Sequence, residues 1–175
     1  MKFRLILISL VVFFLILSVN DFQIYAESKS SSNKRFIDNK DGTISDSKTG
    51  LMWIKNDSFL HSGHWINWSE AKAYINDLNK TGYANYFDWK LPTTRELKTL
   101  YDAEKINSSQ VGREMKIHID PLFGKNGSGS LWSMNGNGRH NAFGVVFNTG
   151  DVFSANKYSR SRKATRGVRI FSHNK

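Results

Sequence analysis

The sequence predicts an α+β fold, a mostly antiparallel sheet with two helices packed against it. Two segments, 67–82 and 93–101, carry helix-start signals followed by apolar residues at helical spacing, and three strand-like segments come after them. Helices and strands grouped in this way favour helices packed on an antiparallel sheet over alternating βαβ units. Aromatic residues make up 13% of the chain, which argues against disorder.

Residues 1–26 are predicted to be an export signal. Met1–Arg4 is basic, and residues 5–19 are apolar apart from two serines. Fifteen residues at about 1.5 Å each span roughly 22 Å, less than the ~30 Å core of a bilayer, so cleavage after Ala26 is favoured over a membrane span. The expected location is periplasmic, secreted or at the cell surface. An uncleaved N-terminal anchor is the alternative.

The exported chain is expected to begin with a short flexible linker and to form one domain. Residues 27–34 are polar and Ser-rich, as is typical of linkers, and leave 35–175 for the domain. The absence of cysteine excludes disulfides, thiolate metal sites, cysteine nucleophiles and a lipoprotein anchor. Removal of the signal takes away two basic residues and one acidic residue, so the net charge of +10 becomes +9 and an anionic partner is expected.

A β-hairpin is predicted between Asp41 and Ile54. Asp41-Gly42 and Lys48-Thr49-Gly50 have the composition of tight turns, and Leu51–Ile54 between polar neighbours indicates a buried strand. An EF-hand loop is excluded, because with Gly42 at its sixth position the first and twelfth residues would be isoleucine and lysine, which cannot bind calcium.

The first helix is predicted to begin after Asn67 and to end at Gly82. Asn67 can cap the helix while Glu70 bonds back to the Asn67 backbone, and glycine is a typical helix stop. Its apolar face is made of Trp68, Ala71, Ile75 and Leu78. His61 and His64 precede the helix in a loop, but no third ligand lies at a recognisable spacing, so no metal is expected there.

The segment 88–97 joins the end of a strand to the start of the second helix. Trp89-Lys90-Leu91 alternates as in a half-buried strand, and Pro92 ends the strand because proline has no N–H. Thr93 and Glu96 form a capping box in front of three apolar positions, which are Leu97, Leu100 and Tyr101. The segment is therefore interpreted as structural.

The last third of the chain is predicted to consist of strands and loops. Strands are expected at 142–147, 151–154 and 166–171, the first two joined by a hairpin turn. The Gly-rich stretches 125–130 and 136–140 lack the spacing of phosphate-binding and dinucleotide-binding loops and are interpreted as flexible connections.

The main functional signal is a basic run between the last two strands. No acidic residue lies between 157 and 169. An arginine fork can bind two oxygens of a sulfate or carboxylate, and charges within a Debye length of about 8 Å act together on a polyanion. The residues predicted to bind a polyanion are Lys157, Arg160, Arg162, Lys163, Arg166 and Arg169, together with Arg139 from a neighbouring loop. The alternative is a solvated face in which Arg166 and Arg169 pair internally with Glu96 or Asp88.

Motifs spread over 35–171 resemble the Lcl C-terminal domain family, typified by the C-terminal domain of the Legionella collagen-like protein. Asp88–Leu97 is similar to the family's D-W-R-L-P-T-x-x-E-L signature. Four other segments are similar to elements of the family, in the same order. Asp41–Trp53 is similar to its D-G-T-x-x-D…T-G-L-M-W element, and Trp68–Ala71 to its W-x-E-A element. Leu131–Ser133 is similar to its W-S element and Arg166–Arg169 to its V-R element. The residues assigned to this structural motif are Trp53, Trp68, Trp89, Pro92, Thr93, Glu96 and Trp132.

The resemblance implies a C-type-lectin-like fold and binding of sulfated glycosaminoglycans. It favours an exported lectin-like module that binds sulfated or uronic-acid polysaccharide, with adhesion as its role and no cofactor. Many relatives carry cysteine where this chain has Ile75 and Gly167, so its core must hold without a crosslink. The alternative is a structural or protein-interaction module of the bacterial envelope.

Enzymatic and nucleic-acid functions are not expected. Formylglycine-generating enzymes, which share the lectin-like fold, rely on cysteines that this chain lacks. General acid–base catalysis needs two carboxylates that face a cleft. The cluster available is Asp88, Glu96 and Asp102, and Glu96 is already assigned to a helix cap. Export makes nucleic-acid binding an incidental capacity of the charge.

Overall fold

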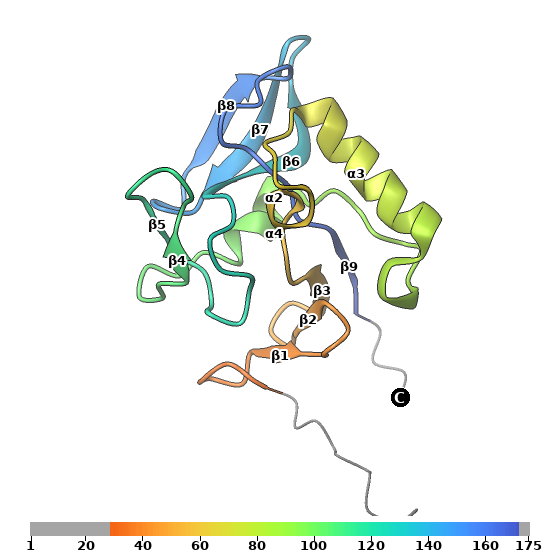
Figure 1. Cartoon of the computed structure of the whole chain (residues 1–175), viewed down its shortest axis with the longest axis vertical. Helices are drawn as coiled ribbons and strands as arrows, with labels where there is room; N and C mark the ends of the chain where they lie inside the picture. Colours follow the sequence, from red (N-terminus) through yellow and green to blue (C-terminus); the bar gives the residue numbers. More distant parts are fainter. Residues whose placement is uncertain (1–28, 172–175) are drawn as a thin grey trace, which may run out of the picture.

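The computed structural model describes residues 29–171 and confirms the α+β class (Figure 1). Within these residues there are three antiparallel sheets and three α-helices, one helix more than predicted. The predicted export signal, 1–26, lies outside the described residues. Among the helices of residues 29–171, none combines the length and apolar character needed to cross a membrane.

The first sheet brings the two ends of the described chain together. Its strands are β1 (Phe36–Asp38), β2 (Thr43–Asp46), β3 (Leu51–Ile54) and β9 (Val168–Ile170), in the order β1-β2-β3-β9. The predicted hairpin is β2–β3, with Ile44 opposite Trp53. β3 also pairs with β9, where Trp53 lies opposite Val168. A central strand is thus shared between the start and the end of the domain.

The other two sheets are hairpin-based. They consist of β4 (Ser108–Ser109) with β5 (Lys116–Ile117), and of β6 (Ser130–Asn137), β7 (Asn141–Val146) and β8 (Val152–Asn156). β6 runs through Gly136 and Asn137, so the predicted flexible connection at 136–140 is wrong for these two residues and only 138–140 forms the tip. The two larger sheets lie at opposite ends of the domain, with α3 along one side (Figure 1).

The two predicted helices begin where the sequence signals place them. They are α2 (Ser58–Ser62), α3 (Trp68–Thr81) and α4 (Thr94–Lys98), with a 3₁₀ turn η1 (Tyr83–Asn85) after α3. Both predicted capping boxes, Asn67 with Glu70 and Thr93 with Glu96, are confirmed. Gly82 ends α3 in the left-handed conformation, with φ 65°. The unpredicted helix, α2, is capped by the side chain of Asp57.

Three of the four motif tryptophans are core residues. Trp53, Trp89 and Trp132 are at most 2% exposed. The indole N–H of Trp132 donates to the Ile66 carbonyl at 3.0 Å, which ties β6 to the segment before α3. The predicted strand at 88–91 pairs with β9 through one bridge, Lys90 with Val168, because Pro92 follows at once.

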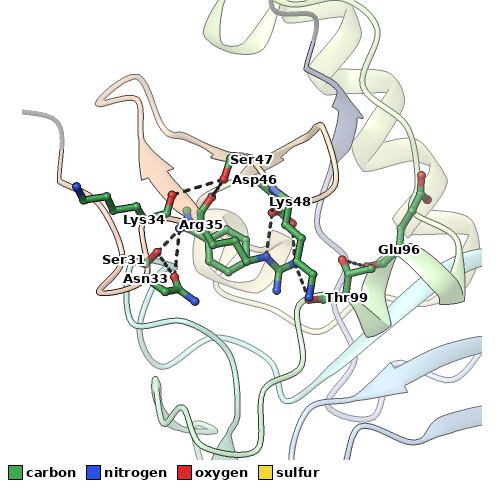
Figure 2. A network of polar contacts seen from close by, with 10 residues as sticks. Ser31, Asn33, Lys34, Arg35, Asp46, Ser47, Lys48, Glu96 and Thr99 are labelled. Atoms are coloured by element: carbon green, nitrogen blue, oxygen red, sulfur yellow. Dashed lines mark hydrogen bonds and ion pairs between the residues drawn. The ribbon is translucent and has the colours of Figure 1, made fainter.

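A buried ion pair joins β1 and β2 to the end of α4 (Figure 2). Arg35 donates to the Asp46 carboxylate through Nε at 2.9 Å and through Nη2 at 2.7 Å. Nη2 also donates to the Thr99 carbonyl at 2.8 Å. Burial by itself raises the pKa of Asp46, but hydrogen bonds from Arg35 and Thr49 leave that pKa below its usual value. The charged pair therefore persists at neutral pH inside the fold.

Residues 29–34 differ from the free linker that their composition predicts. Ser31 is 6% exposed, and its N–H donates to the Phe36 carbonyl at 2.9 Å. In return its hydroxyl accepts from the Phe36 N–H at 2.9 Å. A serine-rich stretch can pack in this way because short hydroxyl side chains replace missing strand bonds.

The sheet that carries the basic loop depends on a close approach at Gly144. A Cβ placed there would lie 2.2 Å from the Leu131 carbonyl oxygen and 2.4 Å from the Phe153 ring, whereas one at Gly136 in the same hairpin meets nothing within 4 Å. We expect Gly144→Ala to lower the free energy of unfolding by about 1–3 kcal/mol or more and Gly136→Ala to change it by less than about 0.5 kcal/mol, measured by urea denaturation. Equal losses would contradict the packing described.

Candidate functional site

The loop after β8 lies between the start of α3 and β6. The carbonyl of Lys157 accepts from the Trp68 N–H at 3.0 Å, and that of Lys163 accepts from the Ile66 N–H at 2.9 Å. On its other side, the Ala164 carbonyl accepts from the Trp132 N–H at 2.8 Å. Backbone bonds at several points therefore fix where the loop presents its basic side chains.

Two ammonium groups share the indole of Trp68. The Lys72 Nζ lies 3.9 Å and the Lys157 Nζ 4.9 Å from a ring centroid of Trp68. Lys157 Nζ also donates to the carbonyls of Gly138 and Arg139, both at 3.0 Å, at the tip of the β6–β7 hairpin. This is the nucleus of what we call the α3-end cluster, composed of Lys72, Arg139, Lys157, Arg160 and Lys163.

Arg160 is the member of the cluster that is paired within the protein. Its Nε donates to Glu70 Oε2 at 2.9 Å, and its Nη2 bonds the other carboxylate oxygen. The hydrogen bonds from Arg160 and from the Asn67 backbone lower the pKa of Glu70 to about 2. Both side chains are solvent-exposed, at 63% and 35%, so the pair contributes little to stability.

Lys163 is half-buried over the aromatic side chains of the sheet. Its Nζ lies 5.5 Å from the Trp132 ring centroid and 5.6 Å from that of Phe153. It donates to the Ser159 hydroxyl at 3.2 Å and the Ser161 carbonyl at 3.0 Å. Burial lowers the pKa of Lys163, as expected for an ammonium removed from water.

Arg166 does not belong to a binding surface, which corrects the prediction for this residue. It is 1% exposed, donates through Nη1 to the carbonyls of Ile54 (2.6 Å) and Lys55, and lies 4.8 Å from the Phe123 ring centroid. A polysaccharide in solvent cannot reach a guanidinium so deeply buried. Its partners are backbone carbonyls more than a hundred positions away along the chain, rather than the carboxylates considered as internal partners from the sequence.

Arg169 is also held by the protein itself. Its Nε donates to Asp88 at 2.6 Å, and its guanidinium lies 3.9 Å from the Tyr86 ring centroid. Its side chain is 14% exposed. The alternative of an internal pair with Asp88 is thus confirmed for Arg169. The seven predicted residues accordingly do not form one patch.

Arg162 is separated from the cluster by its backbone conformation. Its φ of 51° is left-handed, and its side chain lines a pocket with Gln110 and Arg113. Lys157, Arg160 and Lys163 are therefore the residues of the predicted run that the structure brings together beside α3, with Arg139 next to them at the hairpin tip.

Lys72 and the role of Trp68 were missed by sequence reasoning. Trp68 was assigned to the apolar face of its helix, yet it is half-buried and its indole N–H donates to the Ser133 carbonyl at 2.8 Å. The i,i+4 spacing of Trp68 and Lys72 was a usable signal, since such residues are neighbours on a helix.

The carboxylates and histidines considered from the sequence have hydrogen-bond partners in the described part of the chain. Residues 29–171 hold no group of three or more histidine, cysteine, aspartate or glutamate side chains that could bind a metal. Of the acidic residues considered for catalysis, Asp88 bonds Arg169 and Glu96 bonds Thr93. His61 bonds the Tyr74 hydroxyl at 2.6 Å.

The family comparison agrees with the motifs of the sequence. The model of the Lcl C-terminal domain family matches residues 42–169, which is more than half of the chain. The chain therefore belongs to this family. No curated protein matches it.

Arg166 should be essential for folding rather than for binding. We expect Arg166→Met to lower the free energy of unfolding by about 3–5 kcal/mol, because it removes the donor to two buried carbonyls and a cation close to the buried Asp57. The exposed Arg139→Met is the control and should change stability by less than about 0.5 kcal/mol. Chemical denaturation measures both, and similar values for the two variants would refute the anchoring role.

The Glu70 carboxylate should make the stability dependent on acidic pH. Its folded pKa of about 2 lies below its ordinary value of 4.5, so its stabilising effect is fully present above pH 4.5 and is lost as the pH falls toward 2. Glu70→Gln keeps the capping geometry without the charge. The difference in unfolding free energy between the native protein and this variant should shrink over that range, and a difference independent of pH would contradict it.

Proposed function

We propose that this member of the Lcl C-terminal domain family binds sulfated or uronic-acid polysaccharide through the α3-end cluster and acts as an exported adhesion module. One observation carries the proposal. The ammonium groups of Lys72 and Lys157 lie 3.9 and 4.9 Å from the same indole, and neither bonds a carboxylate in the described part of the chain. Two such charges beside one another favour an anionic ligand from solvent.

The cluster is preorganised for oxyanions. An ammonium has three donors, and hydrogen bonds to the protein use two of those on Lys157 and two on Lys163. Each of these groups therefore keeps one donor for a ligand while its position is fixed. Because the side chains are already held, binding costs less conformational entropy than it would for free lysines.

The position of the cluster suits an extended polymer. It lies at the end of the domain formed by the β6–β7 hairpin and the start of α3 (Figure 1). The exposed Tyr158, with 79% of its surface accessible, stands in the same loop and offers an aromatic face to a sugar ring. The C-type-lectin-like topology implied by the family resemblance stays a prediction.

The second candidate is a structural or protein-interaction module of the envelope. It is supported by the use of Arg160, Arg166 and Arg169 within the protein, which leaves fewer free cations than the sequence suggests. On this alternative, heparin would bind weakly and without preference for the cluster.

The Lys72→Ala/Lys157→Ala double variant tests the proposal. We expect its affinity for heparin to fall about tenfold, which corresponds to about 0.7 kcal/mol for each partly exposed ammonium. The control is Lys48→Ala/Lys125→Ala, which removes the same charge from exposed positions in other turns. Affinity is measured by titration at two salt concentrations. Equal losses for the two double variants would favour the second candidate.

Release of Arg160 should strengthen binding. Glu70→Gln frees the Arg160 guanidinium, whereas Asp77→Asn removes the same charge from the same helix, where Asp77 pairs with Lys80. We expect heparin to bind Glu70→Gln more tightly than Asp77→Asn. If both variants bind equally, Arg160 has no part in the site.

A further inference from the structure

A second cationic site lies apart from the α3-end cluster. An open pocket is formed by the β4–β5 turn, the adjoining ends of β6 and β7, and the loop after β8. Its lining consists of Gln110, Arg113, Met115, Ser130, Val146, Asn148, Ser161 and Arg162. These lining residues include two arginines, two serines, one glutamine and one asparagine, and no aspartate or glutamate is among them.

Gln110 carries an unused donor at the base of this pocket. The residue is 2% exposed, and its Oε1 accepts from the Gly129 N–H at 2.9 Å, which fixes the orientation of the amide. The Nε2 group is buried and has no hydrogen-bond partner within residues 29–171. Buried polar groups are normally paired, by water or an ion where the chain supplies no partner, so this donor is open to an acceptor that enters the pocket.

The glutamine is rigidly placed by its neighbours. Its N–H donates to the Met115 carbonyl at 2.9 Å, and its carbonyl accepts from the Arg113 N–H at 3.2 Å. A Cβ at Gly129 would lie 2.7 Å from both Gln110 Oε1 and the Met115 side chain. Gly129 packs closely against the Gln110 amide, so the Nε2 group cannot turn toward another partner.

Arg113 and Arg162 bring positive charge to the pocket that Gln110 lines. Both are exposed, and neither forms an ion pair within the described residues. Arg162 adopts the left-handed φ of 51°, which is unusual for a long side chain, while its carbonyl accepts from the Ser128 hydroxyl at 3.1 Å. Backbone strain of this kind is concentrated at functional sites.

We propose that this pocket binds one oxyanion between the guanidinium groups of Arg113 and Arg162, with the Gln110 amide as the inner donor. Sulfate, phosphate and carboxylate share the required chemistry, since each offers several acceptor oxygens and negative charge to planar guanidinium forks. The site is separate from the one proposed to bind polysaccharide, because none of its lining residues belongs to the α3-end cluster.

The test is a titration of the folded protein with inorganic sulfate, phosphate and acetate. The side-chain amide resonance of Gln110 should shift saturably with at least one of the three anions. Arg162→Gly removes the guanidinium while glycine readily adopts the positive φ, and Gln110→Glu keeps the acceptor for Gly129 but replaces the donor by a charged oxygen. Both variants should bind the anion at least about tenfold more weakly, as followed through the backbone amide resonance of Gly129, which remains in each variant.

The controls separate this site from the α3-end cluster. Arg95→Ala removes an exposed arginine elsewhere and should bind the anion as the native protein does, as should Lys72→Ala/Lys157→Ala. Thermal melting of each variant shows whether it is folded. Absence of a saturable shift with all three anions, or an affinity unchanged by Arg162→Gly, overturns the proposal.

One further arm identifies the source of the anion. Tighter binding of a sulfated disaccharide than of inorganic sulfate, lost in Arg162→Gly, assigns the pocket to a charged group on a sugar. Equal or weaker binding of the disaccharide assigns it to a free anion. Both results support an oxyanion site. If Lys72→Ala/Lys157→Ala keeps the heparin affinity of the native protein, that result contradicts the proposal for the α3-end cluster and leaves the pocket unaffected.

Discussion

The buried guanidinium of Arg166 makes the contact on which the arrangement of the basic loop depends. By donating to carbonyls at the end of β3, it holds the segment between the basic loop and β9 against the core. The loop is thereby fixed at both of its ends, since β8 fixes the other. Without the guanidinium, the Ile54 carbonyl would lose this donor, and the Lys55 carbonyl would keep the bond from the Gly124 N–H. The arginine predicted to meet a ligand instead supports the loop that carries the proposed ligand-binding lysines.

The fold elements governed by local chemistry were predictable from the sequence. The two capping boxes, the left-handed stop at Gly82 and the β2–β3 hairpin follow from residues within a few positions of one another. The pairing of β3 with β9 joins residues more than a hundred positions apart and has no local signature. The short helix α2 was missed because five residues are too few to show helical periodicity.

The candidate site was only partly predictable, for a different reason. Spacing along the sequence made the six basic residues of the run look like one patch, but the structure places them in four environments. Three lie in the α3-end cluster, Arg162 lines a pocket, Arg166 is in the core and Arg169 is paired with Asp88. Lys72 comes from another helix, and its proximity to Lys157 is created by tertiary packing around Trp68. The unpaired amide of Gln110 is likewise a property of packing, which composition cannot show.

The shared sheet at one end of the domain has a consequence for how the surface is displayed. Both described ends of the chain are attached to this sheet, Lys29 through a bond from Asp38 and Phe171 through a bond to Gly50. The α3-end cluster lies at the opposite pole (Figure 1). A surface to which the domain is attached through either end would lie on the side opposite the lysines around Trp68. Several copies on one surface could then bind a single long polyanion, the proposed ligand, at the same time.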